Sequence, residues 1–225
     1  MRLKDMNPEI TQALANFQAL DRELVAEIIA ITELHRNTDG GSRPFASELS
    51  DIGRRSYTKS VFSLFEALSY AMKAWALEAN SRAKRLTRAE QVLAAEDTYV
   101  LTEKGHAERR QAHLPALNNI KFAFHVLAKA YGVDFNLAVS NDGWNSLKTS
   151  RAVRDRLTHP QRPSDLQVSE AEAAAVTHAL LWFQQQLSRL LHSLVEALLQ
   201  KREQAALELE GRRSEKADLE LLAPE

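Results

Sequence analysis

Residues 61–75, VFSLFEALSYAMKAW, determine the fold class of this sequence. The large apolar residues of this stretch recur at steps of three and four positions: Val61, Phe65, Leu68, Met72 and Trp75. Such spacing places them on one face of an α-helix, and it predicts a long helix over residues 56–83 whose apolar stripe is buried. The composition agrees, because 33 Ala and 32 Leu favour helices while only 7 Gly and 6 Pro interrupt 225 residues. We therefore expect an all-α chain.

Charge and cysteine content exclude several classes of function. The chain has 29 Lys and Arg against 30 Asp and Glu, a net charge of -1, which excludes a general basic coat for nucleic acid but not a local basic patch. The absence of Cys removes disulfides, thiolate metal sites and cysteine nucleophiles. No Gly-rich phosphate loop and no GxSxG motif is present, which disfavours ATPases, dinucleotide-binding dehydrogenases and serine hydrolases.

The N-terminal residues 1–8 include Asp5, Asn7 and Pro8 where a signal peptide needs an apolar run. Charges interrupt every stretch that approaches the ~18 apolar residues of a membrane-spanning helix. We expect a soluble, cytoplasmic protein without a membrane partner.

Apolar periodicity and capping residues predict further helices on both sides of the first. These helices cover residues 8–34, a short segment after the Thr87–Glu90 capping box, residues 117–131, residues 141–159, and a last helix after Ser169. Gly211 is expected to end the last helix. Residues 97–115 are expected to be irregular, with a small hairpin and a bare loop both compatible with the sequence.

This pattern divides the chain into three parts. Residues 1–55 form an N-terminal helix and loop packing on the bundle, residues 56–210 form the helical bundle with the insertion at 97–115, and residues 211–225 form a charged flexible tail. The last helix has a seven-residue leucine repeat at Leu180, Leu187 and Leu194. Its apolar surface exceeds what one neighbouring helix would cover, which favours self-association.

The segment from Arg151 to Pro160, RAVRDRLTHP, contains the most informative polar residues. On a helix, Arg154 shares a stripe with Leu147 and Leu157, where an apolar residue is expected. Arg is almost never buried without a partner, so Arg154 is expected to face a carboxylate on a neighbouring helix, or to line a groove or a subunit interface. His159 follows about 140° around the helix, so one straight helix would not direct both side chains to one point.

Several arrangements remain open for these residues. Pro160 breaks the helix and could free His159 to point elsewhere, or two copies could face each other across a two-fold axis and bring two Arg and two His into one cleft. A structural role also fits, because a His in a last helical turn is favourable with the macrodipole and Arg151 can pair with Asp155.

The sequence Arg154-Asp-Arg-Leu-Thr-His159-Pro resembles the signature of the HEPN superfamily, helical domains found in many prokaryotic ribonucleases, toxins and defence proteins. That signature is an Arg, commonly followed by a polar residue, and a His after four to six intervening positions. Asp155 is here the polar residue. The resemblance covers residues 56–200, and Glu66 matches an acidic residue that often lies near the motif. It implies a HEPN-like helical bundle, here with an N-terminal helical extension and a long C-terminal helix.

The resemblance also implies an activity, which is metal-independent cleavage of RNA in a composite cleft of a homodimer, without metal or cofactor. Arg154 and His159 would be the catalytic residues, and Asp155 would have a supporting role in the site. Glu66 would contact the catalytic residues and not the RNA. A toxin or phage-defence effector of this kind would have an antitoxin or a regulatory protein as a further partner. The alternatives are a non-catalytic HEPN-like dimerisation or RNA-binding module, and a helical scaffold that works through its Leu-rich last helix.

The sequence around the motif is locally basic. Arg151, Arg156 and Arg162 accompany Arg154, with Asp155 as the only acid between them, which gives a local charge of +3. The three additional Arg residues are therefore predicted to bind the RNA backbone. Five other histidines show no metal-ligand spacing and are interpreted as surface or core residues: His106, His113, His125, His178 and His192.

Overall fold

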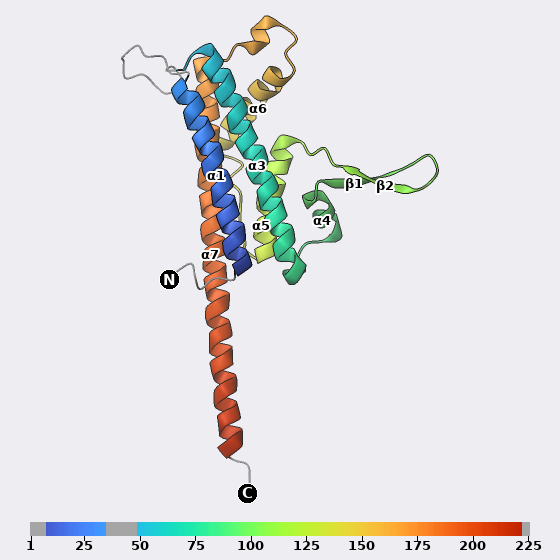
Figure 1. The fold of residues 1–225 in the computed structure, drawn as a ribbon, viewed down its shortest axis with the longest axis vertical. Coiled ribbons are helices and arrows are strands. Elements are labelled where there is room, and N and C mark those ends of the chain that lie inside the picture. The colour runs from blue at the N-terminus through green and yellow to red at the C-terminus, as the bar shows by residue number, and fades with distance from the viewer. Residues whose placement is uncertain (1–7, 35–48, 222–225) are drawn as a thin grey trace.

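The computed structural model describes residues 8–34 and 49–221, and this part of the chain is mostly α-helical (Figure 1). Its helices, in chain order, are α1 (Pro8–Leu34), α3 (Asp51–Ala83), α4 (Arg88–Ala94), α5 (Ala116–Tyr131), α6 (Asp142–Thr158), the 3₁₀ helix η2 (Pro163–Leu166) and α7 (Glu170–Leu221). The predicted all-α fold class is confirmed, with a small hairpin as the exception. The loop predicted between α1 and α3 lies outside the described residues. Among the described helices, none has the length and apolar character needed to cross a membrane.

Residues with capping chemistry mark the helix ends, as the sequence predicts. Thr87 and Glu90 form the expected capping box at the start of α4. Asn141 accepts a hydrogen bond from the backbone N–H of Trp144 at 3.0 Å and so begins α6. Gly132, with φ of +68°, ends α5 in the left-handed region that glycine adopts without steric cost.

Helix α3 is the centre of the bundle, since it packs against α1, α5, α6 and α7. All members of the apolar stripe predicted for this helix are buried. The ring centroids of Phe65 and Phe183 of α7 lie 4.7 Å apart, and those of Phe183 and Phe124 of α5 lie 5.6 Å apart. Three helices therefore meet around one aromatic cluster. The helix begins at Asp51, earlier than predicted, because Ser50 caps it.

Helix α6 packs along the first half of α7, and this contact positions the RAVRDRLTHP segment. Val153 and Leu157 of α6 form a small apolar cluster with Val168 and Ala173, separate from the main core. On another side of α6, Arg154 faces Glu66 of α3.

The start of α6 approaches α7 closely, and a glycine allows this. A Cβ atom placed on Gly143 would lie 2.4 to 2.5 Å from the side chain of Trp182. The indole is held in place because its Nε1–H donates to the carbonyl of Ala138 at 3.2 Å. Only a residue without a side chain fits between the two helices at this point.

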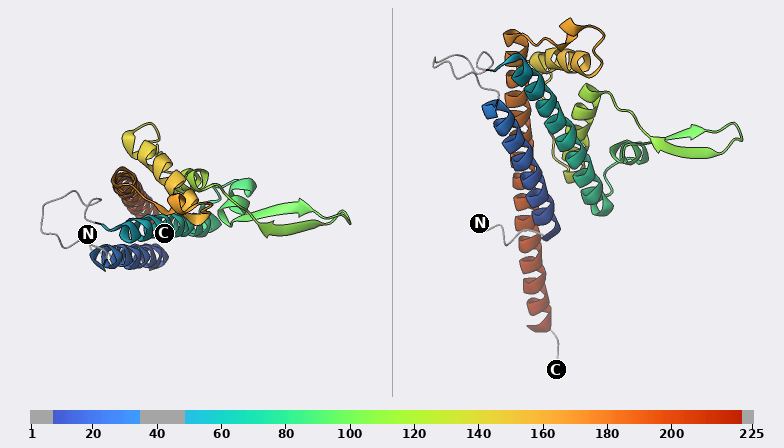
Figure 2. Two further views of the ribbon diagram at one scale, coloured as in Figure 1. Left: turned by 90° about the horizontal axis from the view of Figure 1, so that it is seen from above. Right: turned by 45° about the horizontal axis from the view of Figure 1, so that its top comes forward.

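The insertion at 97–115 contains a regular hairpin, one of the two alternatives that the sequence left open. Strands β1 (Asp97–Leu101) and β2 (Ala107–Gln111) pair antiparallel, from Asp97 opposite Gln111 to Leu101 opposite Ala107. The hairpin projects away from the helices in all three ribbon views (Figures 1 and 2), and every residue of β2 is exposed. The segment that follows β2, by contrast, lies against the bundle beside α3 and α5.

The predicted end of the last helix is wrong. The sequence pattern places a helix end at Gly211 and a flexible tail over 211–225, but α7 continues to Leu221. A single Gly costs a helix only about 1 kcal/mol, and no Pro follows before Pro224, so nothing stops the helix there. The C-terminal part of α7 extends well beyond the other helices (Figure 1). The rest of the predicted tail, residues 222–225, lies outside the described residues.

We predict that Gly143→Ala destabilises the bundle. The new methyl group must displace Trp182 or separate α6 from α7, and overpacking of this kind costs about 1–3 kcal/mol. Urea unfolding followed by circular dichroism measures the change. Asn145→Ala, at an exposed position two residues further along α6, is the matched control and should leave the unfolding free energy within about 0.5 kcal/mol of the parent. Equal stability of parent and Gly143→Ala would contradict the close contact.

Candidate functional site

The guanidinium of Arg154 faces a carboxylate on a neighbouring helix, as the apolar stripe around it requires. Its Nη2 donates to Glu66 Oε1 of α3 at 2.6 Å, and its Nη1 donates to Asp155 Oδ1 at 3.4 Å. The side chain is 30% exposed, so the ion pair lies at the boundary between core and solvent. Two carboxylates therefore fix the orientation of the guanidinium.

Asp155 accepts hydrogen bonds from two arginines. Arg151 Nε donates to Asp155 Oδ2 at 3.2 Å, which is the i, i+4 pair that the helix spacing predicts, while Oδ1 accepts from Arg154. Among the described residues, Nε is the only atom of the Arg151 side chain with a hydrogen bond or ion pair. The terminal nitrogens of Arg151 are thus free to bind another acceptor.

These side chains line a pocket of about 570 Å³ between α3 and α6, which we call the α3–α6 pocket. It is lined by residues from α3, from the segment that follows the hairpin, from the start of α5, and from α6: Glu66, Tyr70, Glu96, Gln111, Ala112, His113, Leu114, Pro115, Ala116, Asn119, Arg151, Arg154 and Asp155. Arg154 therefore has a carboxylate partner on a neighbouring helix and also lines a cavity, and the sequence predicted each of these as an alternative.

A buried lysine lies behind the pocket wall. Lys73 of α3 has no solvent-accessible surface, and its Nζ donates to Glu96 Oε1 at 2.6 Å and to Asn119 Oδ1 at 2.7 Å. Both acceptors line the pocket. A buried ammonium needs such partners, because its desolvation is otherwise prohibitively expensive. Lys73 consequently fixes two polar side chains at the pocket wall.

His159 does not line this pocket. It ends α6, where its backbone N–H donates to the carbonyl of Asp155 at 3.1 Å, and its side chain is exposed. Residues five positions apart on a helix point in different directions, and the side chains of Arg154 and His159 accordingly leave α6 on different sides. Within one chain, the structure brings Arg151, Arg154, Asp155 and Glu66 together, but not His159.

His113 and Tyr70 line the pocket, and the sequence reasoning missed both. From the sequence alone, His113 is interpreted as an isolated surface or core residue, because it shows no metal-ligand spacing to other residues. The segment after β2 brings it beside residues of α3 and α6 that are far away in the chain. No local pattern could have revealed this, because the contact depends on how the hairpin returns to the bundle.

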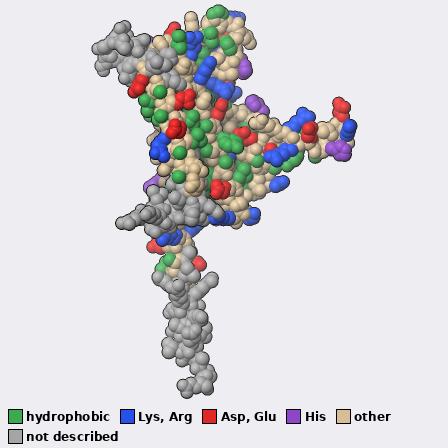
Figure 3. All heavy atoms as spheres, viewed as in Figure 1, with side chains coloured by type: hydrophobic (Ala, Val, Ile, Leu, Met, Phe, Trp, Pro, Cys, Tyr) green, Lys and Arg blue, Asp and Glu red, His purple; other side chains and the backbone are tan. Residues whose placement is uncertain are grey.

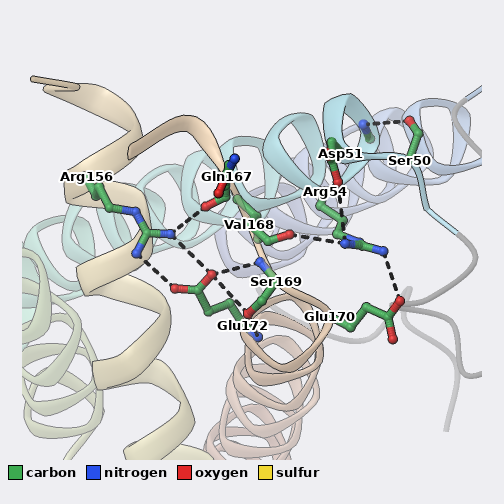
Figure 4. A network of polar contacts seen from close by, with 10 residues as sticks. Ser50, Asp51, Arg54, Arg156, Gln167, Val168, Ser169, Glu170 and Glu172 are labelled. Carbon is green, nitrogen blue, oxygen red and sulfur yellow. Dashed lines mark hydrogen bonds and ion pairs between the residues drawn. The ribbon is translucent and has the colours of Figure 1, made fainter. Parts of the chain in front are cut away.

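Arg156 lies in a different network from Arg154 (Figure 4). Its Nη1 donates to Glu172 Oε1 at 2.9 Å, and its Nη2 donates to the carbonyl of Gln167 at 2.7 Å and to Glu172 Oε2 at 3.2 Å. Its Nε donates to the carbonyl of Asp165 at 3.2 Å. These bonds tie the end of α6 to the loop before α7, which gives Arg156 a structural role. Arg162 is exposed in the same loop, on the α6 side of η2.

Glu172 is the anionic partner in this network and has an altered pKa. Burial raises the pKa of its carboxyl group, but hydrogen bonds from Arg156 and Ser169 outweigh burial, so the pKa lies below its ordinary value. Ser169 and Glu172 also form a capping box at the start of α7, with Ser169 N–H donating to Glu172 at 2.9 Å and Glu172 N–H donating to Ser169 at 3.2 Å.

Comparison with protein families, with characterised proteins and with solved structures finds no match for this chain. Within residues 8–34 and 49–221, no group of three or more His, Asp or Glu side chains is arranged to hold a metal ion. The function must therefore be inferred from the residues of the site itself.

We predict that Glu172→Gln lowers the stability of the chain at neutral pH. Hydrogen bonds to a charged partner contribute about 1.5–3 kcal/mol, and the variant loses the charge that Arg156 binds. Because the pKa of Glu172 is depressed in the folded state, this contribution is present above the unfolded pKa and is lost as pH falls through the folded pKa. The difference in unfolding free energy between parent and variant should thus shrink below about pH 4.5.

Urea unfolding at a series of pH values tests this prediction. Glu170→Gln is the matched control, because Glu170 also pairs with an arginine, Arg54, at 3.3 Å but has a side chain that is 62% exposed. Exposed pairs contribute about 0–1 kcal/mol, so the control should change little at any pH. A Glu172→Gln effect that persists unchanged in acid would refute the ion pair as its cause.

Proposed function

We propose that this chain is a metal-independent endoribonuclease of the HEPN type that acts as a homodimer. The observation that supports this proposal best is the state of Arg154. Its guanidinium lines a pocket and is oriented by Glu66 and Asp155, and the Arg-x4-His motif continues to an exposed His159 at the end of the same helix. His can supply the proton transfers, and Arg the charge stabilisation, that this chemistry needs.

The proposed reaction uses the 2′-hydroxyl of the RNA as the nucleophile. A base removes its proton, the 2′-oxygen forms a bond to the adjacent phosphorus, and the bond from phosphorus to the 5′-oxygen breaks as an acid protonates that oxygen. The products have a 2′,3′-cyclic phosphate and a 5′-hydroxyl. His serves as base or acid because it titrates near neutral pH, and Arg154 stabilises the charge on the phosphoryl oxygens. DNA lacks the 2′-hydroxyl and would not be cleaved.

A dimer is part of the proposal because the His159 of one chain does not lie beside the Arg154 of the same chain. His159 is exposed and lies outside the α3–α6 pocket. A second copy, related by a two-fold axis near the end of α6, would add a second Arg154 and a second His159 to one cleft. One His159 would act as the base and the other as the acid.

Two accessible arginines support an RNA substrate despite the net charge of -1. Arg151 lines the pocket with free terminal nitrogens, and Arg162 is exposed in the loop that follows α6. Lys and Arg side chains gather over the upper ends of α3 and α6 in Figure 3. Such a patch attracts phosphates even when the whole molecule is nearly neutral.

A non-catalytic HEPN-like dimerisation or RNA-binding module is the second candidate. The ion pairs of Arg154 favour it, since a guanidinium bound to two carboxylates also fits a purely structural role. Under this proposal, RNA affinity survives the loss of His159, whereas no RNA is cleaved.

We predict that the purified full chain cleaves a mixed RNA pool in the presence of EDTA and leaves 2′,3′-cyclic phosphate ends. His159→Ala should lower the rate at least 100-fold, as is typical for loss of a general acid or base, and Arg154→Ala should lower it by a similar factor. Gel electrophoresis with end-group analysis by mass spectrometry measures both. His178→Ala, an exposed histidine of α7 outside the pocket, is the matched control and should cleave at the parent rate.

Two results would decide between the candidates. Equal cleavage by the parent and His159→Ala would refute the proposed chemistry, because a contaminating nuclease or another site would be responsible. Binding of RNA by the folded parent without any cleavage would favour the non-catalytic module.

A further inference from the structure

The α3–α6 pocket has the lining of a nucleotide site, and we propose that it binds one nucleotide of an RNA strand, with the base stacked on Tyr70 and a phosphate bound by Arg151. This inference rests on RNA being the ligand, as proposed above. It adds a binding subsite that the Arg-x4-His motif does not contain, because Tyr70 and the segment after the hairpin lie outside that motif.

The size of the cavity fits this ligand. Sites for small molecules and cofactors have volumes of about 300–1,000 Å³, and the pocket of about 570 Å³ lies within that range. A mononucleotide unit fills part of such a volume and leaves room for the strand to enter and leave. Another cavity, between the start of α6 and α7, is smaller at about 370 Å³ and has no arginine in its lining.

Tyr70 provides an aromatic surface at the pocket. It lies one helical turn after Glu66 on α3, and 58% of its surface is exposed, although the neighbouring large apolar residues of this helix are buried. The position of the ring is the informative feature, because Tyr70 combines an accessible ring with a place in the pocket lining. Proteins that bind single-stranded RNA stack unpaired bases on such rings, a contact available to every base because each has a π-face.

Arg151 provides the phosphate contact. Within the described part of the chain its side chain uses only Nε, in the bond to Asp155 at 3.2 Å, and the side chain is 40% exposed. Asp155 therefore orients the guanidinium while the terminal nitrogens remain available. A planar guanidinium matches the oxygens of a phosphate and can bind two of them at once.

Further polar groups of the lining suit the edges of a base and the ribose. His113 lines the pocket with an exposed imidazole that makes no hydrogen bond or ion pair to any described residue. Gln111 adds an amide, and Glu96 adds a carboxylate that Lys73 holds in place. Side chains of these types hydrogen-bond the edges of unpaired bases.

The test uses the full chain and a fluorescein-labelled, mixed-sequence 2′-O-methyl RNA oligonucleotide. This probe keeps the bases and phosphates but has no free 2′-hydroxyl, so it cannot be cleaved by the proposed route. Fluorescence anisotropy gives its Kd. Tyr70→Ala should raise the Kd about 5- to 150-fold, the effect of losing one base–aromatic stack, whereas Tyr70→Trp should bind close to the parent. Arg151→Gln should also raise the Kd and should reduce its dependence on salt.

Two residues of the hairpin provide matched controls. Tyr99 is 54% exposed and Arg110 is 61% exposed, and neither lines the pocket. Tyr99→Ala and Arg110→Gln should therefore bind the probe as the parent does. Because Tyr70 is exposed, Tyr70→Ala should also fold as the parent does, which thermal unfolding checks.

The outcomes separate this inference from the proposed ribonuclease activity. If the parent cleaves natural RNA in a His159-dependent manner while Tyr70→Ala and Arg151→Gln keep the parental Kd and KM, the nucleotide subsite is refuted and the activity stands. If the parent cleaves nothing but binds the probe through Tyr70 and Arg151, the subsite stands and the activity is refuted. Failure of the folded parent to bind the probe would overturn the subsite.

Discussion

Burial of one face of α3 is the constraint on which the rest of the molecule depends. The apolar stripe of this helix meets α5 and α7 through Phe65, Phe124 and Phe183, so the positions of these helices follow from it. Another face of the same helix bears Glu66, Tyr70 and Lys73, which are spaced by four and three residues and so lie on one line. The core therefore sets both the orientation and the depth of the polar groups along the pocket.

The α3–α6 pocket illustrates how a site arises from segments that are distant in the chain. Glu66 and Tyr70 come from α3, His113 follows the hairpin, and Arg151 and Arg154 come from α6. The hairpin itself extends into solvent, but the turn at Glu96 and the return segment close one side of the pocket. Glu96 has φ of +56° and is held by buried Lys73, so an unusual backbone conformation and a buried charge together fix this wall.

The helices of this chain could be predicted because their signals are local. Apolar spacing, capping boxes and Gly132 each act within a few residues, and they locate the helices, although α3 begins at Asp51 and not at residue 56. The end of α7 could not be predicted from Gly211, because a glycine only weakens a helix and the residues around it still favour one. The hairpin remained one of two alternatives, since a short turn-forming segment suits a loop as well as a pair of strands.

The site was predicted only in part, because local sequence does not show which charges meet in space. Between residues 151 and 162 the sequence has four arginines, and Asp155 is the only acidic residue there. In the structure, Glu66 from α3 binds Arg154, and Glu172 from α7 binds Arg156. The local charge is thus largely neutralised by residues that are 88 and 16 positions away. Of the predicted cluster, Arg151 keeps terminal nitrogens available and Arg162 remains exposed.

This neutralisation has a consequence for any anion that binds the site. Carboxylates beside Arg154 weaken the attraction of a phosphate, but they also hold the guanidinium in one orientation, so less conformational entropy is lost when the phosphate arrives. Such an arrangement favours correct positioning over affinity. Under the proposed function, the affinity for an RNA strand comes from groups around Arg154: the guanidinium of Arg151, the ring of Tyr70 and, in the proposed dimer, the same residues of the second copy. A site built in this way orients its ligand with one arginine and retains it with others.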